Sequence, residues 1–207
     1  MSLESSEKKG FIDFLKSNAK LLISLIIILI FVGIFIAWLD YTNKNKRIKI
    51  SEKFIEAKVM LNQNNHSSSS EALKKIINEK DKIYSPLSLF LIIDKNLEKD
   101  KTIILKYFDA VLSIDSLEKE DLNLLKLKKA IFISDTSNES KILILLNPII
   151  NSDSVWKTQS IKFLGDYYFS LKEFKKAEEY YSILLKNEGS NIDINEIKRK
   201  IKLIKND

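Results

Sequence analysis

The 207-residue sequence contains no cysteine and has only four glycines and two prolines. Without cysteine the chain forms no disulfide, has no thiol nucleophile and lacks the ligands of the usual structural zinc sites. Few glycines and prolines leave few positions for tight turns, so the sequence favours long helices joined by short polar loops over an all-β fold. We therefore predict an all-α protein.

Residues suited to catalysis are also scarce. The only histidine, His66, falls in a polar stretch, residues 62–70, that is predicted to be an exposed loop, and a lone loop histidine makes a poor metal ligand or base. No glycine-rich phosphate loop, Gly-x-Ser-x-Gly elbow or His-Glu-x-x-His zinc pattern occurs. Acidic pairs occur without a partner group, at Glu118/Glu120 and Glu178/Glu179. We predict that the protein is not an enzyme and uses no cofactor, metal or small-molecule substrate; a catalytic pocket without a sequence signature is the alternative.

Arginine is nearly absent from a basic sequence. The net charge is +6, yet the only arginines are Arg47 and Arg199. A basic surface attracts phosphate, but bidentate recognition of bases and phosphates favours arginine over lysine. Acidic residues are also interspersed among the lysines. The pattern is typical of solvated helix surfaces, and we predict no nucleic-acid binding.

One long segment, residues 21–39, has no charged residue and is dominated by Ile, Leu, Phe and Val. At 1.5 Å per residue it reaches about 28 Å as a helix, close to the roughly 30 Å of a bilayer's hydrocarbon core. Lys16 and Lys20 flank one end, and the amphipathic rings of Trp38 and Tyr41 lie at the other. The sequence therefore predicts a single transmembrane helix.

Three other interpretations of this segment fit less well. A buried core helix would show a polar face over such a length. A signal peptide has a shorter apolar region and ends in small residues, whereas this segment ends in Ala37-Trp38-Leu39. A transport or sensing helix would carry an ionisable residue within the membrane, and none is present. We predict an uncleaved anchor, whose orientation the similar positive charge on both flanks does not decide.

The remaining chain, residues 40–207, is predicted to be a series of short helices. The first continues out of the membrane through Leu61, Pro148 marks a break, and Gly189 ends the penultimate helix. The other predicted helices cover residues 71–77, 87–95, 101–112, 119–133, 139–146, about 155–168 after a cap at Asp153 or Ser154, 172–186 and 191–205. Antiparallel helices in series are the requirement for an α-solenoid, here of about four to five helix pairs at roughly 34 residues each.

The clearest repeat lies within residues 158–191. Leu164-Gly165-x-x-Tyr168, Ala177 and Tyr181 stand at the offsets of a tetratricopeptide repeat. Glycine and alanine are small where two helices cross closely, and the larger side chains fill the adjoining space. The repeat departs from the consensus at Ile161, Leu184 and Gly189.

The whole layout resembles the bacterial family of ancillary subunits of the SecYEG translocon, whose tetratricopeptide-repeat-like domain is shared with the cell-division coordinator family. Besides the anchor, the resemblance depends on Phe54-x-x-Ala57 and on the Trp156 helix that leads into the repeat. It implies a cytoplasmic segment at 1–20, an inner-membrane helix at 21–39 and a periplasmic domain at 40–207.

The resemblance also implies a function. The expected partners are translocon subunits, periplasmic chaperones or exported clients, bound on a surface to which Gln159, Lys162, Asp166 and Phe169 contribute; we call these four residues the predicted peptide surface. A membrane tether raises effective concentration, so that weak contacts suffice. The alternative is a structural scaffold for another cell-envelope complex, without client binding.

Overall fold

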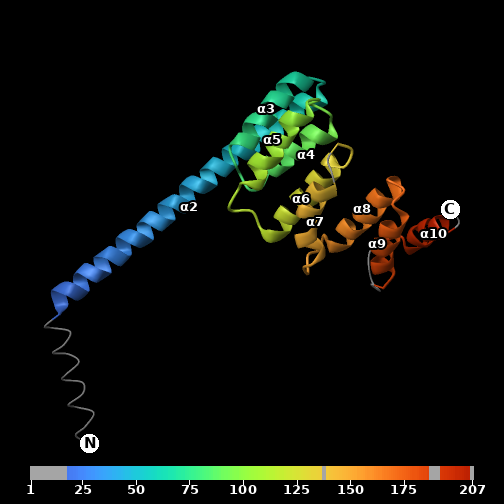
Figure 1. Cartoon of the computed structure of the whole chain (residues 1–207). Helices are drawn as coiled ribbons and strands as arrows, with labels where there is room; N and C mark the ends of the chain where they lie inside the picture. Colours follow the sequence, from blue (N-terminus) through green and yellow to red (C-terminus); the bar gives the residue numbers. More distant parts are fainter. Residues whose placement is uncertain (1–17, 137–138, 187–191, 206–207) are drawn as a thin grey trace, which may run out of the picture. The chain divides into compact units, whose positions relative to one another are not determined.

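The structure is a computed structural model that describes residues 18–136, 139–186 and 192–205. These residues form helices and connecting turns, with no strand among them, as predicted. The chain divides into two compact units, Met1–Lys53 and Phe54–Asp207. Figure 1 shows the order of the helices along the chain.

Helix α2 (Ala19–Asn62) contains the predicted membrane segment and is long and apolar enough to cross a membrane. Where the structure describes the side chains of its most apolar stretch, none is buried. The hydroxyl of Ser24 donates a hydrogen bond to the Leu21 carbonyl oxygen at 2.8 Å, so this polar group is satisfied within the helix itself. The helix also continues beyond the apolar stretch through Leu61, as predicted.

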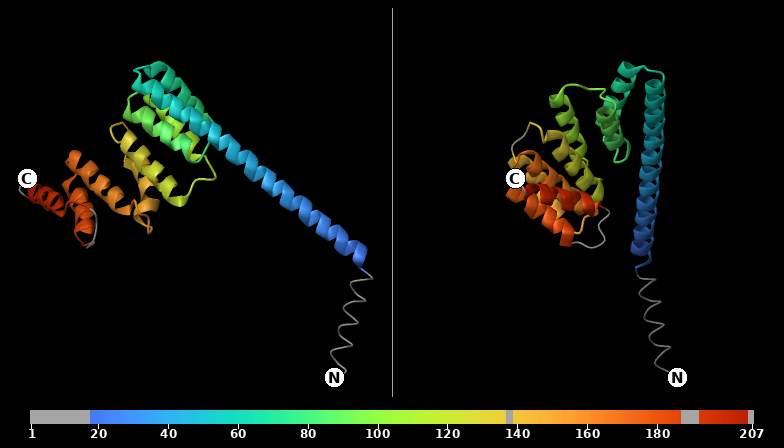
Figure 2. Two further views of the ribbon diagram at one scale, coloured as in Figure 1. Left: turned by 180° about the vertical axis from the view of Figure 1, so that it is seen from behind. Right: turned by 90° about the vertical axis from the view of Figure 1, so that its right-hand side faces the viewer.

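The second unit contains the C-terminal end of α2 and the shorter helices. These are α3 (His66–Asn78), α4 (Tyr84–Asp94), α5 (Lys101–Leu112), α6 (Lys119–Ile133), α7 (Glu139–Ile150), α8 (Lys157–Ser170), α9 (Phe174–Lys186) and α10 (Ile194–Ile204). From α3 onward each helix contacts the next one in the sequence, and α3 also contacts α5. Figure 2 shows α8, α9 and α10 following one another at the C-terminal end of this unit.

The interior of the second unit consists of two apolar clusters. The first is centred on α3, α4 and α5, with Leu73, Leu89 and Phe108 fully buried. The second joins α6 to α10. Phe132 of α6 packs against both clusters, with its ring centroid 5.7 Å from that of Phe108. Burial of these side chains provides the main stabilisation of the unit.

The predicted exposed loop at 62–70 is wrong over its second half, because α3 already begins within it. Ser69 and Ser70 are buried. The Ser69 hydroxyl donates to the Ala57 carbonyl oxygen at 2.8 Å, and the Ser70 hydroxyl donates to that of Leu97 at 3.1 Å. A buried serine is tolerated where a backbone carbonyl accepts its proton, which composition alone does not reveal.

The predicted break at Pro148 is also wrong, because α7 continues to Ile150. Proline removes one N–H donor from a helix interior, which normally weakens the last turn. Here Leu146 and Ile149, on either side of it, are fully buried and hold that turn against the core. The predicted helix end at Gly189 lies outside the described residues.

The other helix boundaries agree closely with prediction for α5 and α6 and shift by a few residues elsewhere. Helix α8 begins at Lys157, two residues later than predicted. The Ser154 hydroxyl accepts from the Trp156 N–H and so caps the turn that precedes the helix. Helix α10 begins at Ile194, since the Asp193 carboxylate accepts from the first backbone N–H groups of that helix.

Candidate protein-binding surfaces

The five residues of the repeat motif lie together in the second apolar cluster. Leu164, Gly165 and Tyr168 are buried on α8, and Ala177 and Tyr181 are buried on α9. A Cβ atom added to Gly165 would lie 2.5 Å from the Tyr181 Cε1 atom, well inside van der Waals contact. Glycine therefore permits the close approach of α8 and α9 at this point.

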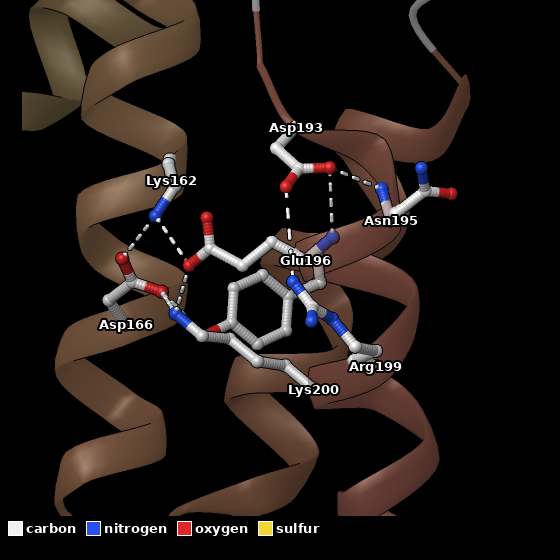
Figure 3. A network of polar contacts seen from close by, with 8 residues as sticks. Lys162, Asp166, Asp193, Asn195, Glu196, Arg199 and Lys200 are labelled. Carbon is white, nitrogen blue, oxygen red and sulfur yellow. Dashed lines mark hydrogen bonds and ion pairs between the residues drawn. The ribbon is translucent and has the colours of Figure 1, made fainter.

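A group of charged side chains covers one face of α8; we call it the terminal network (Figure 3). The Lys162 ammonium lies 2.8 Å from Asp166 Oδ2 and 3.2 Å from Glu196 Oε1. Lys200 of α10 donates to Asp166 Oδ1 at 2.7 Å and lies 2.8 Å from Glu196 Oε1. The Tyr181 hydroxyl donates to the same Asp166 oxygen at 2.7 Å. Positive and negative groups alternate in the network. Its contacts connect α8 to Tyr181 of α9 and to Glu196 and Lys200 of α10.

Hydrogen bonds within the terminal network favour the charged forms of Asp166, Glu196 and Lys200. Burial favours the neutral form of Asp166, but hydrogen bonds from Lys162, Lys200 and Tyr181 outweigh it and hold the pKa of this carboxyl below its ordinary value. Hydrogen bonds from Lys200 and Lys162 lower the pKa of Glu196 in the same way. Burial would lower the pKa of the Lys200 ammonium, yet its two carboxylate partners raise it.

A second polar group ties α7 to α8 and α9. The Glu139 carboxylate accepts from the Tyr168 hydroxyl and from the Lys176 ammonium, the latter at 2.9 Å. These hydrogen bonds lower the pKa of Glu139. The Tyr168 ring stacks on that of Tyr180, with ring centroids 5.5 Å apart. This end of the unit is thus held by polar contacts in addition to its apolar core.

The predicted peptide surface is not uniformly open. Lys162 and Asp166 belong to the terminal network, so α10 of the same chain occupies their polar atoms. Phe169 is partly buried beside Phe174, with ring centroids 5.8 Å apart, and Gln159 is exposed. That these four residues bind a partner stays a prediction, but two of them have a role within the chain.

Helix α4 presents a different surface, because it is apolar on two opposite faces. One face is buried in the first cluster and includes Leu89 and Ile92. The other carries Leu87, Phe90 and Leu91, at positions i, i+3 and i+4 of one stripe. A helix that is apolar all round is normally buried all round. Leu87, however, is 43% exposed.

The second face of α4 forms one wall of a groove of about 720 Å³. We call it the α4 groove, and its lining residues are Phe54 and Lys58 of α2, Leu87, Phe90, Leu91, Ile93 and Asp94 of α4, Phe108 of α5, and Lys128, Ile131 and Phe132 of α6. Its volume lies within the range typical of binding pockets. Ile131, like Leu87, is 43% exposed.

The sequence contains a partial signal for the α4 groove. Residues 84–94 contain too many apolar positions for a helix with one buried face, which indicates either complete burial or a binding surface. The lining from Phe54 and Ile131 depends on packing between separate helices, which no local pattern reveals. Among residues 18–136, 139–186 and 192–205, no group of three or more His, Asp or Glu side chains is arranged to hold a metal ion.

Comparison of the chain with protein-family models, with curated proteins and with solved structures finds no match. The features of the chain that bear on its function are the apolar helix, the α4 groove and the terminal network.

Proposed function

We propose that this protein is a membrane-anchored protein–protein interaction module, in which the unit Phe54–Asp207 binds another protein through the α4 groove. The groove carries the proposal, because a concave apolar surface with exposed large side chains marks binding sites on folded domains. Solvent-exposed Leu87 and Ile131 gain the most by association, since each still has a large apolar area to bury.

The anchor is the apolar part of α2. Its large side chains are exposed, including Phe31 at 68% and Ile34 at 61%. Such a surface is stable in lipid and unfavourable in water, whereas the helix satisfies its own backbone hydrogen bonds. Tethering confines the α4 groove to the membrane vicinity and raises its effective concentration towards membrane-associated partners.

The finer proposal follows the family resemblance. The protein is accessory to the SecYEG translocon and to periplasmic chaperones in handling exported proteins, with residues 1–20 in the cytoplasm and the helical unit in the periplasm. Among the described residues, α2 is the one helix long and apolar enough to cross a membrane, and it is followed in the sequence by an all-helical unit. Both features support this assignment, as does the tetratricopeptide-like spacing of α8 and α9. In this proposal the helix pairs form a tetratricopeptide-repeat-like solenoid.

The side of the membrane is tested with single cysteines, because the natural chain contains none. Asp153→Cys places a thiol on an exposed turn between α7 and α8. A membrane-impermeant maleimide added outside spheroplasts is expected to label it, with labelling after lysis as the control. Labelling only after lysis would place the unit in the cytoplasm and contradict the translocon-exit role.

The groove is tested by co-purification of translocon subunits with the tagged full chain after mild detergent extraction. Ile131→Asp introduces a charge into the α4 groove and is expected to abolish recovery. Ile183→Asp is the matched control, because Ile183 is the same residue type, is 42% exposed and lies on α9. Equal recovery with both variants would exclude the groove as the binding surface. One stoichiometric partner from another envelope complex, without translocon subunits or exported clients, would instead favour the scaffold alternative.

A further inference from the structure

We infer that the occupant of the α4 groove is an amphipathic helix with acidic residues beside its apolar stripe. This inference rests on the proposed function and specifies the partner's chemistry.

The lining of the α4 groove favours a helical occupant over an extended one. All of its lining residues lie on helices, whose backbone groups are bonded internally. An extended peptide would therefore find no strand edge to pair with and would bury unpaired backbone N–H and C=O groups. A helix satisfies these groups itself and presents only side chains.

The spacing of the walls fits the ridges of another helix. Leu87, Phe90, Leu91 and Asp94 of α4 follow the i, i+3, i+4, i+7 pattern over two turns, about 10 Å. Across the groove, α6 supplies a second short ridge that includes Ile131. Ridges of this kind accept the side chains of a third helix, which anchors through its own i, i+3, i+4 and i+7 positions.

The charged side chains beside the groove determine the sign of the charge that a partner must carry. Lys58 and Lys128 are exposed lining residues, and neither has a carboxylate within 4.0 Å in the part of the chain that the structure describes. The Lys58 ammonium instead lies 6.0 Å from the centroid of the Phe54 ring. Asp94, the acidic residue of the lining, already forms an ion pair with Lys95 at 3.0 Å.

An occupant must therefore approach two ammonium groups that lack an ionic partner. Covering them with an apolar or basic helix would remove water without replacing its hydrogen bonds, whereas carboxylates at the border of the apolar stripe would compensate both charges. Charge complementarity thus selects an acidic amphipathic helix.

The test is selection from a displayed library of peptides about 14 residues long, roughly four helical turns, against the purified full chain in detergent micelles. The selected peptides are expected to combine an i, i+3, i+4, i+7 apolar stripe with flanking Asp or Glu. Their affinity is expected to fall about tenfold or more for the Lys58→Glu/Lys128→Glu variant, which should itself select basic flanking residues. The control is Lys175→Glu/Lys186→Glu on α9, which changes the net charge equally and should have no effect.

The outcomes separate this inference from the proposed function. Groove binders that Ile131→Asp abolishes, but whose flanking charge is neutral, basic or unchanged by the lysine reversal, would overturn the inference and leave the interaction module intact. Absence of any binder sensitive to Ile131→Asp would overturn both. A dimer in light scattering that Ile131→Asp dissociates would assign the groove to a second copy of the chain. Quenching by brominated lipid of a fluorophore attached at Leu87→Cys would assign it to the bilayer. Either result would overturn the inference.

Discussion

Helices α4 and α8 differ in what covers their second face. On α8 that face carries Lys162 and Asp166, and α10 covers it with charges of complementary position. On α4 the second face carries Leu87, Phe90 and Leu91 and lines the α4 groove, where Leu87 is still 43% exposed. The charged face of α8 is thus paired within the chain, whereas part of the apolar face of α4 remains exposed. The exposed surface therefore lies on α4 and not on α8, the helix that carries the repeat motif.

The largest expected effect on the free energy of unfolding comes from comparing substitutions on the two faces of α4. Leu89→Ala creates a cavity in the first cluster and is expected to reduce the free energy of unfolding by about 2–5 kcal/mol. Leu87→Ala removes a half-exposed side chain and is expected to cost less than about 1 kcal/mol. Urea denaturation followed by circular dichroism measures both. Similar losses would mean that the second face of α4 is covered within the chain.

The close approach of α8 and α9 gives the next effect. Gly165→Ala directs a methyl group against the Tyr181 ring, which is fully buried and held by its hydrogen bond to Asp166. The ring cannot move without breaking that bond, so we expect a loss of about 1–3 kcal/mol in the free energy of unfolding. The same denaturation experiment checks it. A neutral result would mean that the two helices lie farther apart than described.

The terminal network predicts a pH dependence. Its hydrogen bonds lower the pKa of Asp166, so the stabilisation is complete above the ordinary aspartate pKa of about 3.9 and is lost as the pH falls through the lowered folded-state value. Asp166→Asn is expected to cost about 1–2 kcal/mol at pH 7, allowing for the 34% exposure of the side chain. The difference in unfolding free energy between the natural chain and the variant should shrink below about pH 4. A difference independent of pH would contradict the ionic account.

The smallest expected effect is an increase, not a decrease, in the free energy of unfolding. The buried hydroxyl of Ser160 on α8 has no hydrogen-bond partner among the residues that the structure describes. Ser160→Ala is therefore expected to stabilise the protein by up to about 1 kcal/mol. Ser69→Ala is the matched control, because the Ser69 hydroxyl donates to the Ala57 carbonyl oxygen and its removal should destabilise by about 1 kcal/mol. Differential scanning calorimetry should show melting temperatures that move in opposite directions; equal shifts would imply a partner for Ser160.

Local patterns predicted the bounds of α5 and α6 well, although α6 contributes buried residues to both apolar clusters. The loop prediction was wrong at residues 66–70, because the hydrogen bond from Ser69 to the distant Ala57 carbonyl oxygen depends on tertiary packing. The break at Pro148 was wrong because burial of Ile149 outweighs one missing hydrogen bond. The family resemblance implied a partner surface on α8, and no local pattern indicated that α10 pairs with Lys162 and Asp166.

The sequence indicates the α4 groove only in part, for a related reason. It is lined by residues of α2, α4, α5 and α6, which are distant in sequence. The composition of residues 84–94 is apolar, but it does not show which face of the helix stays exposed. By contrast, the exposed apolar stretch of α2 needs no tertiary information, since its length and lack of charge are visible in the sequence itself.

The central claim is that this chain contacts its partner through the α4 groove. The most direct measurement is site-specific photocrosslinking in intact cells, with a photoreactive residue replacing either Leu87 or Gln159 in the full-length chain. We expect a discrete adduct with one identifiable protein from position 87 that disappears in the Ile131→Asp background, and none from position 159. An adduct from position 159 that persists in that background, with none from position 87, would contradict the account.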